Sequence, residues 1–201
     1  MKKLLFVLSL ALGLVWNAAA SLPEKVYTIK SGHYVYKMSM FGFEMGNVDT
    51  WFDDYGLKTY AATSMNLMGE KMEMYVTING KRKLTVTVSD GEKEQEISDV
   101  ERDDYGDYVL LDSMSAEELG KAGIQRLEDE EVMGYHTQVY KKKTETEAGK
   151  EAWTIINVWN GIPLKASIEM NGNRMNLLEL VSVETDIDVD PALFVIPETI
   201  E

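Results

Sequence analysis

The chain has no cysteine among its 201 residues, only four prolines and only two histidines. Without cysteine, disulfide bonds, thiol catalysis and zinc–thiolate sites are excluded, so packing and hydrogen bonds have to supply the stability. Acid–base and metal chemistry recruit histidine first. His33 and His136 each stand alone at a predicted strand start, and no Gly-x-Ser-x-Gly motif is present. We therefore expect no enzymatic activity, no catalytic residues, no metal site and no cofactor.

Long hydrophobic runs are absent except at the amino terminus. The first twenty residues combine Lys2 and Lys3, an apolar run over 4–16 and the small residues 18–20. This pattern is typical of a cleaved export signal, and the run is too short for a comfortable membrane span. We expect cleavage after Ala20, no lipid anchor because no cysteine follows, no integral membrane segment in the mature chain, and a periplasmic location.

Positive charge is scarce. Twenty lysines and arginines face 34 aspartates and glutamates, which gives a net charge of −14, and removal of Lys2 and Lys3 with the signal makes it −16. A field of this sign repels phosphate backbones and anionic lipid surfaces, so nucleic acid is not expected as a partner. The remaining 181 residues, 21–201, are enough for a single domain with one core.

Period-2 alternation of apolar and polar residues dominates the chain and predicts a mainly β fold. The strands are expected near 26–30, 33–41, 44–53, 57–67, 71–78, 83–89, 124–131, 135–142, 152–158, 162–171 and 174–186. Asn79-Gly80 between two alternating runs predicts a tight hairpin turn. So many adjacent strands imply one large, strongly bent antiparallel sheet.

Three segments depart from this alternation. Ser115 with Glu118 three residues later is a capping box and predicts a short helix over 115–122. The acidic segment 90–107 is poor in apolar residues, so we expect an exposed, mobile connection, with a role as a lid left open. Asp190 before Pro191 predicts a helix cap, followed by a tail that closes one end of the core.

The spaced aspartates Asp186, Asp188 and Asp190 invite comparison with a calcium loop. Such a loop requires a glycine where Pro191 stands, and a distal glutamate at a fixed spacing that is missing here. We interpret these aspartates as a solvated face that ends in a helix cap.

Methionine is concentrated between positions 38 and 74, on predicted neighbouring strands. Methionine is flexible and polarisable, so it suits a soft-walled cavity for an apolar ligand, but it also serves as ordinary core filler. The alternation leaves both interpretations open, as well as the question of which sheet face is concave. The candidate cavity-lining residues are Tyr36, Met38, Met40, Met72, Met74 and Val76.

Four stretches, IKSGHYVYKM, WFDDYGLKTY, VWNGIPLKASIEMNG and VDPALFVIP, occur in an order that resembles exported proteins of Gram-negative bacteria in the LolA/LolB-like superfamily of outer-membrane lipoprotein carriers and receptors. The resemblance spans most of the mature chain. It implies a half-barrel of roughly eleven antiparallel strands, with short helices and loops over a concave face that holds lipid acyl chains. We interpret the Trp159–Lys165 segment as an anchor of the sheet, since Gly161 permits a turn and Pro163 suits a strand start.

Two functions follow as hypotheses. The first is a periplasmic, non-enzymatic binder or carrier of an apolar ligand, such as a lipid or a lipoprotein acyl chain, in the half-barrel cavity. The alternative is an envelope protein-interaction or scaffold module with a filled core and no small ligand, in which the acidic surface or a sheet edge contacts a partner protein.

Overall fold

The computed structural model describes residues 22–40, 42–67, 69–105, 111, 114–145 and 151–200. The predicted signal segment and its cleavage site lie outside these residues.

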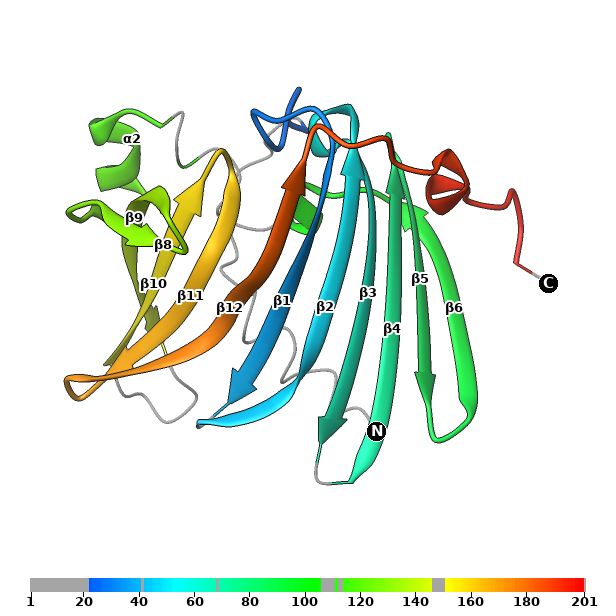
Figure 1. The fold of residues 1–201 in the computed structure, drawn as a ribbon, viewed down its shortest axis with the longest axis horizontal. Helices are drawn as coiled ribbons and strands as arrows, with labels where there is room; N and C mark the ends of the chain where they lie inside the picture. Colours follow the sequence, from blue (N-terminus) through cyan, green and yellow to red (C-terminus); the bar gives the residue numbers. More distant parts are fainter. Residues whose placement is uncertain are drawn as a thin grey trace. The chain divides into compact units, whose positions relative to one another are not determined.

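The described chain is mainly β, as predicted (Figure 1). Its strands form one antiparallel, twelve-stranded sheet in the order β6-β5-β4-β3-β2-β1-β12-β11-β10-β9-β7, with β8 paired to β9. The strands are β1 (Gly32–Met40), β2 (Phe43–Asp53), β3 (Lys58–Leu67), β4 (Glu70–Asn79), β5 (Arg82–Ser89), β6 (Glu92–Asp99), β7 (Ile124–Arg126), β8 (Glu130–Val132), β9 (Tyr135–Glu145), β10 (Glu151–Trp159), β11 (Ile162–Met170) and β12 (Asn173–Thr185).

Contacts along the chain divide it into two units. One, here called the β1–β6 unit, comprises Glu24–Val100 and Leu178–Glu201; the other, the β7–β11 unit, contains Glu101–Leu177. Strand β12 runs through the boundary between them. The single domain over 21–201 stays a prediction.

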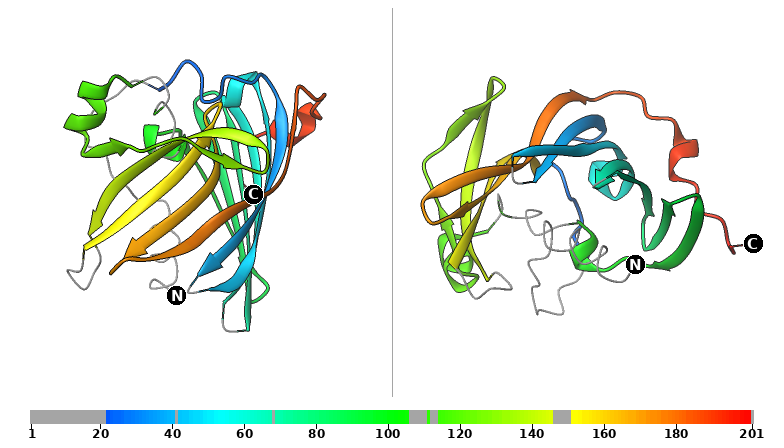
Figure 2. Two further views of the ribbon diagram at one scale, coloured as in Figure 1. Left: turned by 60° about the vertical axis from the view of Figure 1, so that its left-hand side comes forward. Right: turned by 90° about the horizontal axis from the view of Figure 1, so that it is seen from below.

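The strands of the β1–β6 unit curve, with the 3₁₀ turn η1 (Asp54–Gly56) on the inner side (Figure 2). Cross-strand register assigns each side chain to one of two faces, because directly opposed residues of antiparallel strands point the same way. The core face carries most of the buried side chains of β1 to β4, namely Tyr34, Tyr36, Thr50, Phe52, Thr63, Met65 and Ile78, whereas the buried Thr77 lies on the opposite face. The opposite face, here called the outer face, carries His33, Trp51 and Tyr60, which are only half-buried.

The predicted strand over 26–30 is wrong. Val26 and Tyr27 are buried, but both backbone N–H groups donate to the Tyr55 carbonyl at 2.9 Å, and no sheet ladder forms. The Tyr27 ring packs on Phe52 with centroids 4.6 Å apart, and its hydroxyl lies 2.9 Å from that of Tyr34. The segment is thus irregular and is anchored to η1. Its apolar residues are like those of a short strand, which explains the wrong prediction.

The predicted mobile connection over 90–107 is also wrong for its first half. Residues Glu92–Asp99 form β6, which pairs antiparallel with β5 from Ser89↔Glu92 to Arg82↔Asp99. Asp90 and Gly91 both adopt positive φ, which is the geometry of a two-residue hairpin turn. The strand is exposed and charged because it is the edge of the sheet, and the 3₁₀ turn η2 (Arg102–Tyr105) follows.

In the β7–β11 unit the predicted helix is confirmed as α2 (Ala116–Lys121) with a complete Ser115–Glu118 capping box. Leu119 of α2 packs in a small core against β7, β9 and β10, formed by Leu111, Leu119, Ile124, Tyr140 and Val158. The strand predicted over 124–131 is instead two short strands, β7 and β8, interrupted at 127–129. With the added β6 and the missing 26–30 strand, this split explains twelve strands against the expected eleven.

The anchoring role predicted for the Trp159–Lys165 segment agrees with its burial. Asn160 and Gly161 both adopt positive φ in the β10–β11 turn, and Ile162 and Leu164 are fully buried. At the carboxyl end, Asp190 caps the 3₁₀ turn η4 (Pro191–Phe194) by accepting a hydrogen bond from the Ala192 N–H at 2.9 Å, as predicted.

Candidate functional site

The predicted cavity-lining residues share the core face of the β1–β6 unit. Tyr36 is 5% exposed and belongs to the core, whereas the other five side chains are half-buried, namely Met38, Met40, Met72, Met74 and Val76. Met38 lies opposite Gly46, and Met72 lies opposite the buried Met65. The register therefore brings the methionines of β1, β3 and β4 onto one surface, and their role as cavity walls stays a prediction.

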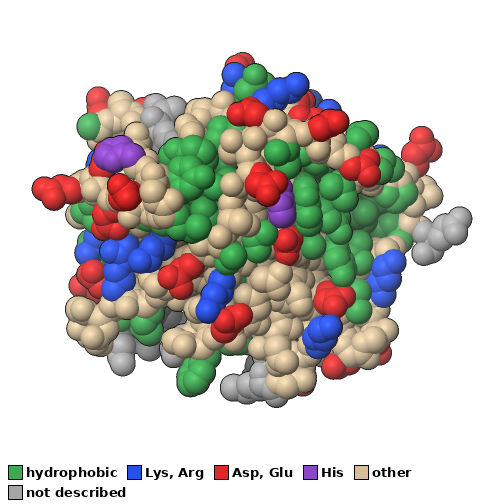
Figure 3. Space-filling view, in the orientation of Figure 1, with side chains coloured by type: hydrophobic (Ala, Val, Ile, Leu, Met, Phe, Trp, Pro, Cys, Tyr) green, Lys and Arg blue, Asp and Glu red, His purple; other side chains and the backbone are tan. Residues whose placement is uncertain are grey.

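The outer face holds a feature that the sequence interpretation missed, an aromatic and aliphatic band two residues wide. One row runs across β1 to β6 as His33, Trp51, Tyr60, Thr77, Leu84 and Ile97, and the next as Val35, Asp49, Ala62, Tyr75, Val86 and Gln95. We call these two rows the outer band. Figure 3 shows hydrophobic side chains gathered over β2 to β5 beside a histidine.

Ring contacts connect the aromatic members of the outer band. The His33 and Trp51 rings stack at 4.4 Å with an interplanar angle of 14°. Trp51 and Tyr60 are 5.8 Å apart, and Tyr60 and Tyr75 are 6.5 Å apart at 20°. All four side chains remain half-buried, so the rings pack on one another along the face and still present apolar surface to solvent.

Polar partners fix two positions in this band. The Tyr75 hydroxyl donates to Glu73 Oε2 at 2.9 Å; this bond raises the pKa of Tyr75, and it is the main reason that the pKa of Glu73 is lowered. Partial burial raises the pKa of Tyr60. Asp49 accepts a hydrogen bond from Asn47 Nδ2 at 2.8 Å and lies 3.4 Å from His33 Nε2.

The carboxyl-terminal tail covers one end of the outer face, beyond the aromatic row. Asn79 Nδ2 donates to the Phe194 carbonyl at 3.0 Å, and Arg82 donates to the Pro197 carbonyl at 2.9 Å. Phe194 is buried. The prediction that this tail closes one end of the core is therefore wrong about the face, because Asn79 and Arg82 hold the tail on the outer face.

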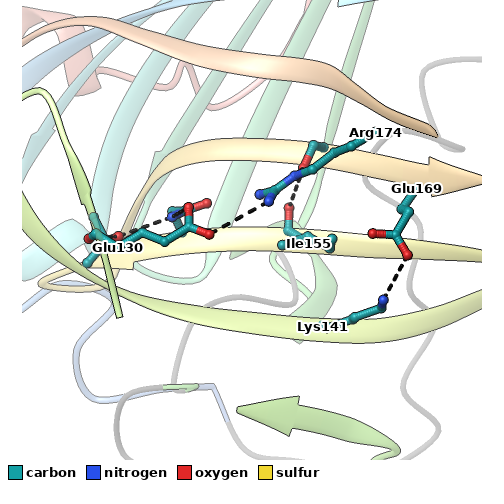
Figure 4. A network of polar contacts seen from close by, with 8 residues as sticks. Glu130, Lys141, Ile155, Glu169 and Arg174 are labelled. Carbon is teal, nitrogen blue, oxygen red and sulfur yellow. Dashed lines mark hydrogen bonds and ion pairs between the residues drawn. The ribbon is translucent and has the colours of Figure 1, made fainter. Parts of the chain in front are cut away.

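A second polar constellation lies in the β7–β11 unit (Figure 4). The fully buried Asn157 donates to Glu130 Oε2 at 3.0 Å and to Thr137 Oγ1 at 3.1 Å. Arg174 donates to the buried Ser167 hydroxyl at 2.6 Å and lies 3.7 Å from Glu130. These contacts join β8 and β12 to the sheet between them, so we assign this cluster to structure.

The histidines lie in different surroundings. His136 is 80% exposed and lies 2.9 Å from Asp129, which also pairs with Arg126. These contacts, chiefly the hydrogen bond from Arg126, lower the pKa of Asp129. His33 lies in the aromatic row. His33 belongs to the β1–β6 unit and His136 to the β7–β11 unit.

Over the described ranges, no group of three histidine, aspartate or glutamate side chains is arranged to hold a metal ion. Within the same ranges, no helix combines the length and the apolar character needed to cross a membrane.

Comparisons with known proteins find similarity to solved structures at low identity. Neither a protein-family model nor a curated protein sequence matches the chain. Among solved structures, the chain is similar to a crystal structure of MucB, with 13% identity over 87% of this chain and 60% of the other and a TM-score of 0.42. It is also similar to the Pseudomonas aeruginosa MucA/MucB complex, with 12% identity, 83% and 56% coverage and a TM-score of 0.42. The chain therefore spans less than two thirds of these structures.

Proposed function

We propose that this protein is a non-enzymatic binding module of the cell envelope that docks a partner protein on the outer band. The observation that carries this proposal is the row His33, Trp51 and Tyr60, which places large aromatic side chains on the face opposite the core. Contiguous apolar surface of this kind on a soluble chain marks interaction sites. Tryptophan and tyrosine are also the residues that dominate protein–protein binding energy.

The arrangement of the rings favours a protein over flat ligands. His33 and Trp51 use their faces to stack on each other, and Tyr60 and Tyr75 are likewise nearly parallel. The band therefore offers ring edges together with the aliphatic Leu84 and Val86, which suits apolar side chains better than stacked bases or sugars. Nucleic acid is further disfavoured by the net charge of −14.

Photo-crosslinking in the native envelope tests this function. A photoreactive phenylalanine analogue at position 60 should give a discrete adduct with a defined protein, and the same analogue at the exposed Asn173 serves as the control. The adduct should disappear from a variant that carries both the photoreactive analogue at position 60 and Trp51→Asp, provided that this variant accumulates in folded form. Labelling at position 60 that equals labelling at position 173 would overturn the proposal.

A second candidate function rests on the core face. Met38, Met72 and Met74 are half-buried there, and Met72 lies opposite the buried Met65, so the methionine surface is only partly covered. A lipid or acyl chain that covered it would gain about 0.8 kcal/mol for each buried methylene. This candidate keeps the apolar carrier implied by the resemblance to LolA/LolB-like proteins.

Native mass spectrometry and uptake of a fluorescent fatty acid test this second candidate. Met74→Asp should abolish uptake while circular dichroism shows a retained fold, and Met133→Asp at an exposed turn is the matched control. Absence of both bound lipid and fatty-acid uptake in the wild-type protein would exclude the carrier and leave the protein-docking proposal untouched.

A further inference from the structure

We infer, on the basis of the proposed docking function, that the partner contributes an apolar segment bearing a lysine or arginine, whose cation lies over the β12 end of the outer band. The inference rests on an uneven distribution of charge around that band. Three carboxylates lie at this end, on the two strands that flank β1: Asp49 of β2, and Glu179 and Glu184 of β12.

Register places each of these acids on the outer face. Glu184 of β12 lies directly opposite His33, and Glu179 lies opposite Lys37. Asp49 occupies the second row of the outer band, opposite Val35. Glu184 is exposed and Asp49 is half-buried, so both carboxylates can meet a docked side chain at the edge of the aromatic row.

The nearby cations are already engaged. Lys37 pairs with Glu44 at 2.7 Å, and Lys71 with Glu73 at 3.4 Å. Arg82 donates to the carbonyls of the carboxyl-terminal tail. The other basic residues that register places on this face are Lys58 of β3 and Lys93 of β6, which belong to other rows.

His33 is the remaining basic side chain beside these acids. Its Nε2 lies 3.4 Å from Asp49 Oδ1, and its ring is held by stacking on Trp51. The imidazole contacts one carboxylate, that of Asp49, and Glu179 lies opposite Lys37, so Glu184 is the carboxylate that remains for an incoming cation. Asp186 and Asp188, which come after β12 in the chain, are both exposed.

Charge and apolar surface together define the partner. A segment with apolar side chains over Trp51, Tyr60 and Val86 and a cation over Asp49 and Glu184 would match both. The same carboxylates repel an acidic segment, as does the chain's net charge of −14. A cationic partner would also be steered toward this end, so association should slow as salt screens the field.

Selection from a random 12-residue peptide display library on immobilised mature protein tests the inference. Selected peptides should combine aromatic or leucine residues with at least one lysine or arginine. The best peptide, labelled with fluorescein, is then measured by anisotropy at 20 mM and 1 M salt, alongside a version with its cations replaced by glutamine.

The expected loss in affinity is about threefold for Asp49→Asn or Glu184→Gln and about tenfold for both together at low salt, as for partly exposed ion pairs. The glutamine peptide should show no such loss, and 1 M salt should erase the difference. The double change Glu92→Gln and Glu94→Gln on the exposed edge strand β6 is the matched control, and it should leave affinity unchanged. Tyr60→Ser should weaken both peptides in either salt.

The outcomes separate this inference from the docking function. Selected peptides without cations that still depend on Tyr60 would overturn the inference and keep the docking function. Peptides that bind independently of Tyr60 and Trp51 would overturn both. Concentration-dependent dimerisation that Tyr60→Asp abolishes would replace the cationic partner with a second copy of the chain.

Discussion

The imidazole of His33 stacks on the indole of Trp51, with centroids 4.4 Å apart, on the face of the sheet opposite the core. The next residue along the strand, Phe52, points to the other face and is fully buried. Two consecutive aromatic residues of β2 therefore have different roles, one at the proposed docking surface and one in the core.

Substitution of these neighbours should separate the two roles. Trp51→Ala should cost about 1 kcal/mol, because a cross-strand aromatic contact on an open face is lost. Phe52→Ala should cost about 4 kcal/mol, because it leaves a cavity in the core. Urea unfolding measures both values, and equal losses would contradict the assignment of the faces.

Gly46 should not tolerate a side chain. Its φ is +154°, and an added Cβ would lie 1.8 Å from the carbonyl oxygen of Ser64 on β3. Gly46→Ala should destabilise by roughly 2–4 kcal/mol. Gly42→Ala is the control, since its φ is also positive but no atom lies within 4 Å, and it should cost only about 1 kcal/mol. Chemical denaturation that ranks Gly42→Ala as the worse variant would be inconsistent with this geometry.

Asn157 should be important for stability despite being polar. Asn157→Ala removes two hydrogen bonds made by a fully buried side chain, one of them to the carboxylate of Glu130, and should cost about 3 kcal/mol. The exposed Asn173, changed to Ala, should stay within about 0.5 kcal/mol of wild type. Thermal melting of both variants provides the comparison, and a neutral Asn157→Ala would refute the structural role of this cluster.

The Ser115–Glu118 capping box should make the stability of α2 depend on pH. Hydrogen bonds from the Ser115 side chain and backbone lower the pKa of Glu118 in the folded state. A lowered pKa means that Glu118 stabilises the fold above its unfolded pKa, and that this contribution is lost as pH falls through the folded value. The advantage of wild type over Glu118→Gln should therefore shrink between pH 7 and pH 3, as measured by unfolding at each pH.

Ser115→Ala should cost about 1 kcal/mol at neutral pH, because the first turn of α2 loses its cap. A pH-independent difference between wild type and Glu118→Gln would show that the carboxylate is not engaged in solution.

The carboxyl-terminal tail should be held mainly by Phe194. Phe194→Ala should cost about 3 kcal/mol, because this side chain is buried, whereas Val195→Ala at a 67% exposed position should change little. Limited proteolysis should release the tail faster from Phe194→Ala than from Val195→Ala. Equal proteolysis rates would mean that the hydrogen bonds of Asn79 and Arg82 suffice to hold it.

Much of the fold is predictable because alternation and turn residues are local signals. The hairpin at Gly80 and the capping box at Ser115 follow from short motifs. The β5–β6 hairpin had an equally clear signal in Asp90-Gly91. The acidic composition after it was misinterpreted as a linker, although an edge strand has no partner on one side and is therefore free to be charged.

The outer band was harder to predict, because composition does not say which side of a strand faces water. Tyr75 and Thr77 alternate with Met74 and Val76, so apolar residues lie on both faces of β4. Only the register across β1 to β6 shows that the aromatic residues of several strands form one row. The irregular cover over 26–30 also depends on distant contacts, since its backbone partner is Tyr55.

The composition of β6 has a consequence for how copies of this protein behave at high concentration. Its free edge begins Glu92-Lys93-Glu94-Gln95-Glu96, and all five residues are exposed. A second molecule that tried to extend the ladder there would bring like charges within a few ångströms of each other, which disfavours amyloid-type stacking. Although this chain has apolar residues on both faces of its sheet, the charged edge of β6 therefore opposes fibril growth.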